Sequence, residues 1–348
     1  MTTPPPRARP PLSVLDLASV SEGMSSGDAL AATTAIARRA DELGFARFWV
    51  AEHHSMPAVA STTPPVLIAH LAAATERIRV GSGGVMLPNH APLVVAEQFA
   101  MLEALHPSRI DLGIGRAPGA DPATAAALRR TADGSDVADF PQHVLDVLGL
   151  LGDPRGATGL AMRFTATPAA DGGPRPGASA PPVWLLGSSG YSAQLAGELG
   201  LPFSYAHHFN TPYTDQALAL YRSSFRPSPA LDAPRAMVSA SVIVADTSEE
   251  ADYLAGPSRV MALSLRRGTL APIVPPERAA KILSDLSEVD RAQLDQLPGT
   301  QIRGTAEHAV TELEALAART QSDELMVTAT TFDPATRIGT LEALAAAW

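Results

Sequence analysis

Short apolar runs alternate with stretches of helical periodicity along most of this chain. Apolar runs of a few residues are typical of strands buried on both faces, and apolar residues recurring every three or four positions are typical of amphipathic helices. The predicted strands are residues 12–17, 48–54, 77–87, 109–114, 183–186, 202–205, 236–245 and 324–328. The predicted helices are residues 28–43 with Asp28 as N-cap, 62–75, 92–105, 121–130, 140–151, 191–199, 213–225 and a last stretch to 348. This alternation predicts a (β/α)8 TIM barrel.

Three segments fall outside the alternation. Residues 1–11 are rich in proline and predict a disordered lead-in to a single barrel domain over residues 12–348. Residues 152–182 are rich in glycine and proline and predict a long loop. Residues 256–302 exceed what a simple barrel needs and predict an insertion after the seventh strand. An insertion on the catalytic face favours a lid, with a small second domain or a dimer arm as the alternative.

Three predicted strands end in unusual polar or glycine-rich clusters. These clusters are Glu52-His53-His54, residues 81–90 and residues 115–119. In a β/α barrel the active site lies at the carboxyl ends of the strands, a region called the barrel mouth below. The clusters therefore predict a single site at the barrel mouth.

The histidine pair supplies the candidate catalytic group. Side chains alternate along a strand, so His54 should share a face with Glu52 while His53 points the other way. The pKa of histidine lies near neutrality and suits acid–base work, which makes His53 the candidate catalytic residue. The alternative is a pair of hydrogen-bonded structural histidines.

A metal site is a competing interpretation. Enough ligands are present in number, namely Glu52, His53, His54, His70 and His90. However, adjacent strand residues diverge, and the chain has neither cysteine nor a His-Glu-x-x-His pattern. We therefore predict no metal.

The glycines and the arginine of the other two clusters suit a flat anionic ligand. Gly83 and Gly84 interrupt an apolar strand, which marks a bulge or a close approach to the backbone, as of a flat aromatic ring. Residues 113–119 have a spacing one residue too long for a dinucleotide fingerprint. Arg116 fits an anion clamp instead.

A small-residue turn after the fifth strand predicts a phosphate site. The turn opens a helix, whose free N–H groups attract anions, and its residues are Ser188, Ser189, Gly190, Tyr191 and Ser192. An ordinary serine N-cap is the alternative. A hydrolase would need a G-x-S-x-G elbow, which is not the spacing here.

Composition narrows the class of protein further. The net charge of −10 and the pI near 5.4 argue against a nucleic-acid surface. The chain has no cysteine, no run long enough for a membrane span and no signal-peptide core. We therefore expect a cytoplasmic protein that contacts neither nucleic acid nor membrane.

Together these motifs resemble the bacterial luciferase-like flavin-dependent monooxygenases, in the branch of single-subunit homologues. The matching segments are residues 49–54, 81–90, 92–99, 109–119 and 183–192. The likeness runs from about residue 12 to the C-terminus and is weakest across 256–302. In place of the reactive cysteine of luciferase this chain has Gly115, and luciferase works as an unlike pair, so light emission is not expected.

The resemblance implies a (β/α)8 barrel that binds FMN and usually forms a homodimer. It places His53 near the reactive flavin edge and a non-proline cis peptide at Gly83-Gly84, beneath the isoalloxazine ring. It implies that the FMN phosphate is bound by Arg116 and by the turn of residues 188–192, chiefly through the hydroxyls of Ser189 and Ser192.

The resemblance also implies an activity. Reduced FMN, supplied by a separate flavin reductase, would react with O2 to give a C4a-peroxyflavin that oxygenates a small organic substrate. Candidate pocket residues are Trp49, Met86, His207, His208 and Phe209. The alternatives are hydride transfer with the deazaflavin F420, a non-catalytic flavin-binding protein and, most remotely, a metal-dependent barrel hydrolase.

Overall fold

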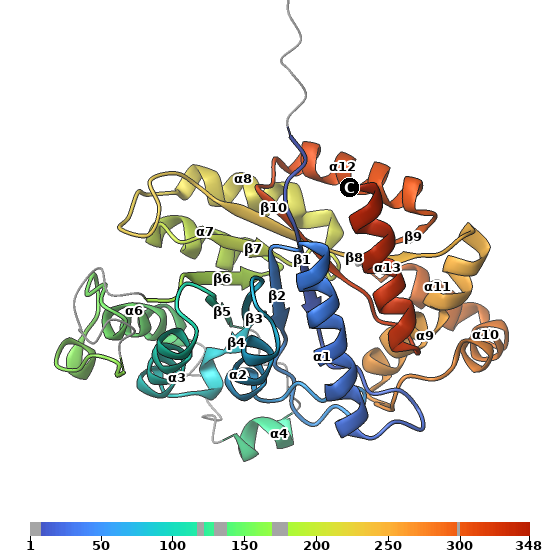
Figure 1. Ribbon diagram of the computed structural model, residues 1–348, viewed down its shortest axis with the longest axis horizontal. Coiled ribbons are helices and arrows are strands. Elements are labelled where there is room, and N and C mark those ends of the chain that lie inside the picture. Colours follow the sequence, from blue (N-terminus) through green and yellow to red (C-terminus); the bar gives the residue numbers. More distant parts are fainter. Residues whose placement is uncertain (1–7, 117–121, 129–137, 169–179, 298–299) are drawn as a thin grey trace, which may run out of the picture.

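The chain folds around a closed barrel of eight parallel strands (Figure 1). The computed structural model describes residues 8–116, 122–128, 138–168, 180–297 and 300–348. The barrel strands are β1 (Leu12–Asp16), β2 (Arg47–Val50), β3 (Arg79–Ser82), β5 (Ile110–Gly115), β6 (Val183–Gly187), β7 (Phe203–Tyr205), β8 (Ala236–Val244) and β10 (Glu324–Thr328). They pair in that order, and β10 closes the ring between β8 and β1. The predicted TIM barrel is confirmed.

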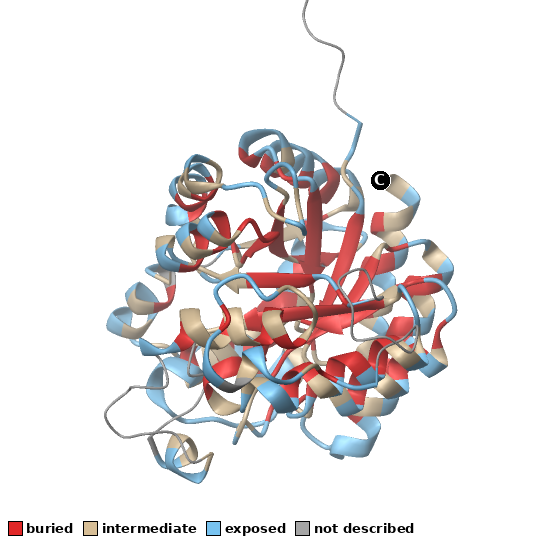
Figure 2. Ribbon diagram, turned by 90° about the vertical axis from the view of Figure 1, so that its left-hand side faces the viewer, coloured by how far each residue is buried: buried red, intermediate tan, exposed pale blue. Residues whose placement is uncertain are grey.

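Helices cover the outside of the barrel and leave its strands buried (Figure 2). They are α1 (Ser26–Leu43), α2 (Pro64–Ala74), α3 (Pro92–Leu105), α4 (Pro122–Ala127), α6 (Phe140–Leu150), α7 (Gly190–Leu199), α8 (Thr214–Ser224), α12 (Ala306–Thr320) and α13 (Pro334–Ala347). Parts of two predicted segments lie outside the described residues. They are residues 121 and 129–130 of the helix predicted over 121–130, and residues 169–179 of the loop predicted over 152–182. Within the described part of the chain, no helix combines the length and apolar character that crossing a membrane requires.

The start of α1 differs from the prediction. Its N-cap is Ser25, not Asp28, and the two residues form a capping box. The amide of Asp28 donates to the Ser25 hydroxyl at 3.1 Å, and the amide of Ser25 donates to the Asp28 carboxylate at 2.9 Å. Asp28 is therefore the third residue of the helix, where its negative charge interacts favourably with the positive end of the helix dipole.

The predicted third strand is divided in two. After β3, Gly83 and Gly84 break the pairing, and β4 (Val85–Met86) resumes it farther along β5. The short 3-10 helix η1 (Leu87–Asn89) follows.

The insertion is larger and more regular than the prediction. It begins with α9 (Ser248–Arg267), continues through α10 (Pro276–Ser284) and α11 (Glu288–Asp295), and ends in β9 (Gln301–Gly304), which pairs with the end of β8. Residues 298–299 lie outside the described residues. The predicted start near residue 256 lies inside α9, which already begins at Ser248.

The insertion is tied to the loop after β1. The amide of Ile273 donates to Val20 O at 3.0 Å, and the amide of Glu22 donates to Ile273 O at 2.8 Å. Arg278 also pairs with the Glu22 carboxylate at 2.7 Å. Ile273 is buried against apolar side chains of the loops after β1, β2 and β10, which are Leu17, Met56, Ala58, Val59 and Phe332. The insertion therefore lies against the barrel mouth.

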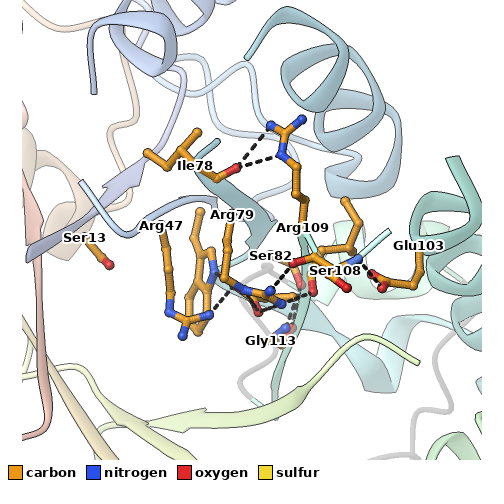
Figure 3. Close-up of polar contacts among 12 residues, drawn as sticks. Ser13, Arg47, Ile78, Arg79, Ser82, Glu103, Ser108, Arg109 and Gly113 are labelled. Atoms are coloured by element: carbon orange, nitrogen blue, oxygen red, sulfur yellow. Dashed lines mark hydrogen bonds and ion pairs between the residues drawn. The ribbon is translucent and has the colours of Figure 1, made fainter. Parts of the chain in front are cut away.

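An ion network lies at the amino-terminal end of the barrel strands, opposite the mouth, and Figure 3 shows Arg47, Arg79 and Ser13 from it. The Asp111 carboxylate accepts hydrogen bonds from Arg47 at 2.6 Å and from Arg79 at 2.7 Å. Arg47 also donates to Glu324 at 2.8 Å, and the hydroxyl of Ser13 donates to the same carboxylate oxygen. Above this network lies an apolar layer of Leu15, Trp49, Ala51, Trp184, Met237 and Met326. The barrel interior is thus closed below the mouth.

The end of the predicted lead-in is in contact with the last helix. Residues 1–7 lie outside the described residues. Arg9 donates to Glu314 at 2.6 Å and stacks over the Trp348 ring, and the Trp348 indole donates to Pro10 O at 2.9 Å.

Asp41 anchors the turn between α2 and β3, and its replacement should lower stability. Its carboxylate accepts from the amides of Glu76 at 2.6 Å, Ile78 at 2.9 Å and Arg77 at 3.2 Å. We expect Asp41→Ala to lower the free energy of unfolding by about 1–3 kcal/mol, measured by urea denaturation at pH 7. The matched control is Glu76→Gln, an exposed side chain whose amide still donates to Asp41.

The same site gives a pH dependence. Burial alone would raise the pKa of Asp41, but the three amides and Arg77 outweigh it and lower the pKa below 3.8. The stabilisation is then fully present above about pH 4 and is lost as the pH falls through the lowered pKa. The difference between wild type and Asp41→Ala should therefore shrink toward pH 3. A difference that stays constant from pH 7 to pH 3 would contradict this account.

Candidate functional site

Glu52 joins the loops after β2 and β4 at the barrel mouth. Its buried carboxylate accepts from His54 Nε2 at 2.8 Å, from His90 Nε2 at 2.9 Å and from the amide of Met86 at 3.0 Å. Burial would raise the pKa of Glu52, but these hydrogen bonds, led by the one from His90, lower it instead. Glu52 is therefore an ionised anchor, and His54 points to it as the alternation predicted.

These contacts also bear on the metal interpretation. The two imidazole Nε2 atoms donate to one carboxylate oxygen, which is a hydrogen-bonding arrangement. His70 lies on α2 and contacts Thr34 of α1 at 3.0 Å, away from this cluster. Over the described ranges, no three histidine, aspartate or glutamate side chains are arranged to hold a metal ion.

His53 lies beside Glu52 but has different surroundings. Its amide donates to Ser61 O at 3.1 Å, while its buried Nδ1 has no hydrogen-bond partner among the described residues. Burial lowers the pKa of His53, and the negative charge of Glu52 opposes that shift only in part. A neutral imidazole with an unsatisfied buried nitrogen is suited to bind a ligand or to exchange a proton.

The Gly83-Gly84 peptide is cis, as the resemblance predicted. A Cβ on Gly83 would lie 2.6 Å from Leu15 Cδ1, and one on Gly84 would lie 2.8 Å from Gly113 O. Close packing within the protein is therefore sufficient to require glycine at both positions. The contact of this peptide with a flavin ring stays a prediction.

Arg116, which follows β5, meets the start of α7, which follows β6. The Arg116 guanidinium carbon lies 4.0 Å from the centroid of the Tyr191 ring, a cation–π contact that holds the arginine beside the helix. Ser189 is the N-cap residue, yet its hydroxyl makes no capping hydrogen bond. The Ser189 side chain is thus not a capping acceptor here, and among the described residues no side chain caps the first N–H groups of α7, which could bind an anion.

The other residues of this turn have structural contacts. The carbonyl of Ser188 accepts from Asn210 at 2.9 Å and from the Tyr205 hydroxyl at 3.2 Å. Ser192 is buried, and a Cβ on Gly187 would lie 2.6 Å from its side chain. Gly187 thus lets Ser192 pack beneath the turn. Phosphate binding by Ser188, Ser189, Gly190, Tyr191 and Ser192 stays a prediction.

The predicted pocket residues fall into two groups. Trp49 is fully buried in the apolar layer below the mouth, and His207 is buried against Thr214 of α8. His208 and Phe209 lie in the loop after β7, and the Phe209 side chain is 57% exposed. Sequence reasoning missed Ser239 of β8, which contacts His208 at 3.0 Å. The alternation of residues along β8 was the available signal, since Met237 points into the barrel.

Comparison with known proteins gives consistent matches. Residues 11–324 match the family described as luciferase-like monooxygenase. A protein of Escherichia coli K12 named luciferase-like monooxygenase is 42% identical, with 95% of this chain and 94% of that protein covered. An uncharacterized Bacillus subtilis protein, YvbT, is 44% identical, with 97% and 96% covered.

Solved structures agree with this result. The crystal structure of apo-MsnO8 is 35% identical and covers 97% of both chains with a TM-score of 0.86. Two more distant structures share the fold. The FMN complex of the oxygenating constituent of 3,6-diketocamphane monooxygenase from Pseudomonas putida is 20% identical, covers 97% of both chains and has a TM-score of 0.69. An F420-dependent secondary alcohol dehydrogenase is 16% identical, covers 98% of this chain and 99% of its own and has a TM-score of 0.66.

Proposed function

Because this chain belongs to the luciferase-like monooxygenase family and is therefore an oxidoreductase, we propose that it binds reduced FMN and uses O2, by the C4a-peroxyflavin route, to oxygenate a small organic substrate. The observation that carries the choice of FMN is the Arg116–Tyr191 contact beside the uncapped start of α7. A guanidinium next to free helix N–H groups fits a terminal phosphate.

Different residues at the mouth bind different parts of FMN. Arg116 and the residue 188–192 turn hold the phosphate, and the Gly83-Gly84 peptide supports the ring. When bound, the reduced flavin supplies the reaction with O2 and the transfer of one oxygen atom. The unpartnered Nδ1 of His53 donates to or accepts from the flavin edge or the substrate. Its neutral state and burial suit proton exchange near neutral pH.

The insertion shields the same site from water. Its contacts through Ile273 and Arg278 hold it against the loop after β1. Exclusion of water favours oxygen transfer over the release of hydrogen peroxide. The proposal also includes a separate flavin reductase and a cytoplasmic location.

Replacing Arg116 tests the cofactor directly. We expect Arg116→Ala to weaken FMN binding by roughly tenfold to a hundredfold, since a charge-assisted hydrogen bond to phosphate is lost. Binding of riboflavin, which has the same ring without phosphate, should change little. Fluorescence titration of both ligands measures this, with Arg155→Ala as control because Arg155 forms a surface ion pair with its neighbour Asp153.

The same titration separates FMN from F420. Tighter binding of F420 than of FMN by wild type would replace the proposal by a deazaflavin-dependent hydride transfer. Equal loss of FMN and riboflavin affinity in Arg116→Ala would refute the phosphate clamp. If wild type binds FMN but its reduced form consumes no O2, the protein binds flavin without being a monooxygenase.

The proposed homodimer has a candidate surface on α2 and α3. These neighbouring helices expose five large apolar side chains, which are Val66, Leu93, Val94, Met101 and Leu105. The α2 sequence carries no charged residue, so its outer face can pack against a second copy of itself without unpaired charges.

Charges on that surface should prevent dimer formation. We expect the double variant Val66→Glu with Leu105→Glu to halve the mass measured by light scattering, because burying two carboxylates per protomer is unfavourable. Val289→Glu on α11, with a side chain that is 67% exposed elsewhere, is the matched control. A wild-type protein that is monomeric, or a double variant that still dimerises, contradicts the assignment.

A further inference from the structure

Two consecutive histidines in the loop after β7 have different partners. His207 Nδ1 lies 2.6 Å from the Thr214 hydroxyl at the start of α8, in a buried position. His208 Nδ1 lies 3.0 Å from the Ser239 hydroxyl and 3.4 Å from the Ser239 carbonyl oxygen on β8. Its ring also packs on Phe209, with 4.1 Å between centroids. His207 thus contacts the helix α8, whereas His208 contacts the barrel strand β8.

The partners of His208 determine which ring nitrogen carries the proton. The Ser239 hydroxyl donates to Tyr205 O at 3.2 Å, so it is left to accept from His208. The Ser239 carbonyl can only accept. Nδ1 is therefore the protonated nitrogen, and burial, which lowers the pKa of His208 to about 4, keeps the ring neutral. Nε2 is left with a free lone pair and has no partner among the described residues.

His208 lies across the barrel from His53. Between β2 and β7 the strands β3, β5 and β6 intervene on one side, and β8, β10 and β1 on the other. Ser239 shares the inward face of β8 with Met237, so its hydroxyl places the His208 ring above the apolar layer. The two imidazoles therefore follow opposite strands of the barrel, β2 and β7.

We propose that His208 Nε2 accepts a hydrogen bond from an O–H or N–H group of the substrate. This inference rests on the proposed function and narrows its substrate to organic molecules that carry such a donor. Ser239 acts as a positioning residue because it fixes the tautomer. Phe209 holds the ring in place and adds apolar surface beside the donor. The unprotonated Nε2 can accept a hydrogen bond but cannot donate one. A molecule whose O–H or N–H group is methylated has no hydrogen to offer and should therefore bind less tightly.

The tautomer is the first measurement. Histidine-selective 15N labelling of the FMN-loaded protein, with assignment by loss of the signal in His208→Phe, reports both ring nitrogens at pH 7. We expect a protonated Nδ1 and an unprotonated Nε2. A protonated Nε2 overturns the proposal.

The second measurement uses phenol and its methylated counterpart anisole as probes. We expect phenol to shift the His208 Nε2 resonance and to bind roughly fivefold more tightly than anisole, as one hydrogen bond would give. His208→Phe should bind both equally. The control His207→Gln keeps a hydrogen bond to Thr214 and should retain the preference for phenol.

If the wild-type protein binds phenol and anisole with equal affinity, the proposal is overturned, and no variant is needed to reach that conclusion. These measurements are made at equilibrium with oxidised flavin and can be repeated without flavin. They can therefore succeed even if the protein never reacts with O2, and a failure here leaves the monooxygenase proposal standing.

Discussion

Replacing Asp111 by asparagine is expected to lower the free energy of unfolding by about 3–5 kcal/mol. The carboxylate is fully buried and accepts from Arg47, Arg79 and the Trp49 indole. The neutral amide leaves two guanidinium groups without their shared counter-charge in the closed end of the barrel. Urea denaturation at pH 7 measures the loss.

The control for Asp111 is a surface ion pair. Asp215 pairs with Arg319 at 3.4 Å, and both side chains are about half exposed. Asp215→Asn should change the free energy of unfolding by less than about 0.5 kcal/mol. If Asp111→Asn costs no more than this control, the ion network does not hold the barrel end together.

Replacing His53 by alanine should reduce oxygenation roughly a hundredfold to ten-thousandfold while leaving FMN affinity within about threefold. The imidazole is half-buried at the end of β2, and its buried Nδ1 has no hydrogen-bond partner among the described residues, whereas Arg116 and the α7 turn follow β5 and β6. Reoxidation of the bound reduced flavin would then yield hydrogen peroxide rather than oxygenated product. Stopped-flow absorbance and a peroxide assay measure the two outcomes.

His70→Gln is the matched control for His53. It replaces an exposed histidine on α2 that contacts α1 and should alter neither measurement. A His53→Ala protein whose turnover and peroxide yield match those of wild type would exclude a catalytic role. If this variant lost much of its affinity for FMN, the role of His53 would be cofactor binding rather than catalysis.

The barrel could be predicted because its strands are continuous apolar runs. Segments such as 183–186 and 324–328 are too short and too apolar for surface helices, and the structure places both in the barrel. The insertion was predicted as an irregular segment, but it opens with the long helix α9, which already begins at Ser248. The strand β9 was missed because Gln301 and Arg303 break its apolar pattern, and it forms only by pairing with the long β8.

The candidate site could be located from sequence, but its partners could not. The position of His53 follows from a strand end, which is local information. The role of Glu52 depends on His90 and Met86, which reach it from another loop. The ion network is less accessible still, since Arg47 meets Asp111 and Glu324 only when the barrel closes. Contacts of this kind depend on strand register, which periodicity does not specify.

The separation of the two barrel ends matters for how such proteins diversify. Charges at the closed end stabilise the barrel without touching the mouth, where His53, Arg116 and His208 come from loops. Substitutions that alter substrate choice can therefore accumulate in those loops while the closed end retains the free energy needed to tolerate them. Directed evolution of this chain for new substrates should accordingly succeed more often when libraries spare Arg47, Asp111 and Glu324.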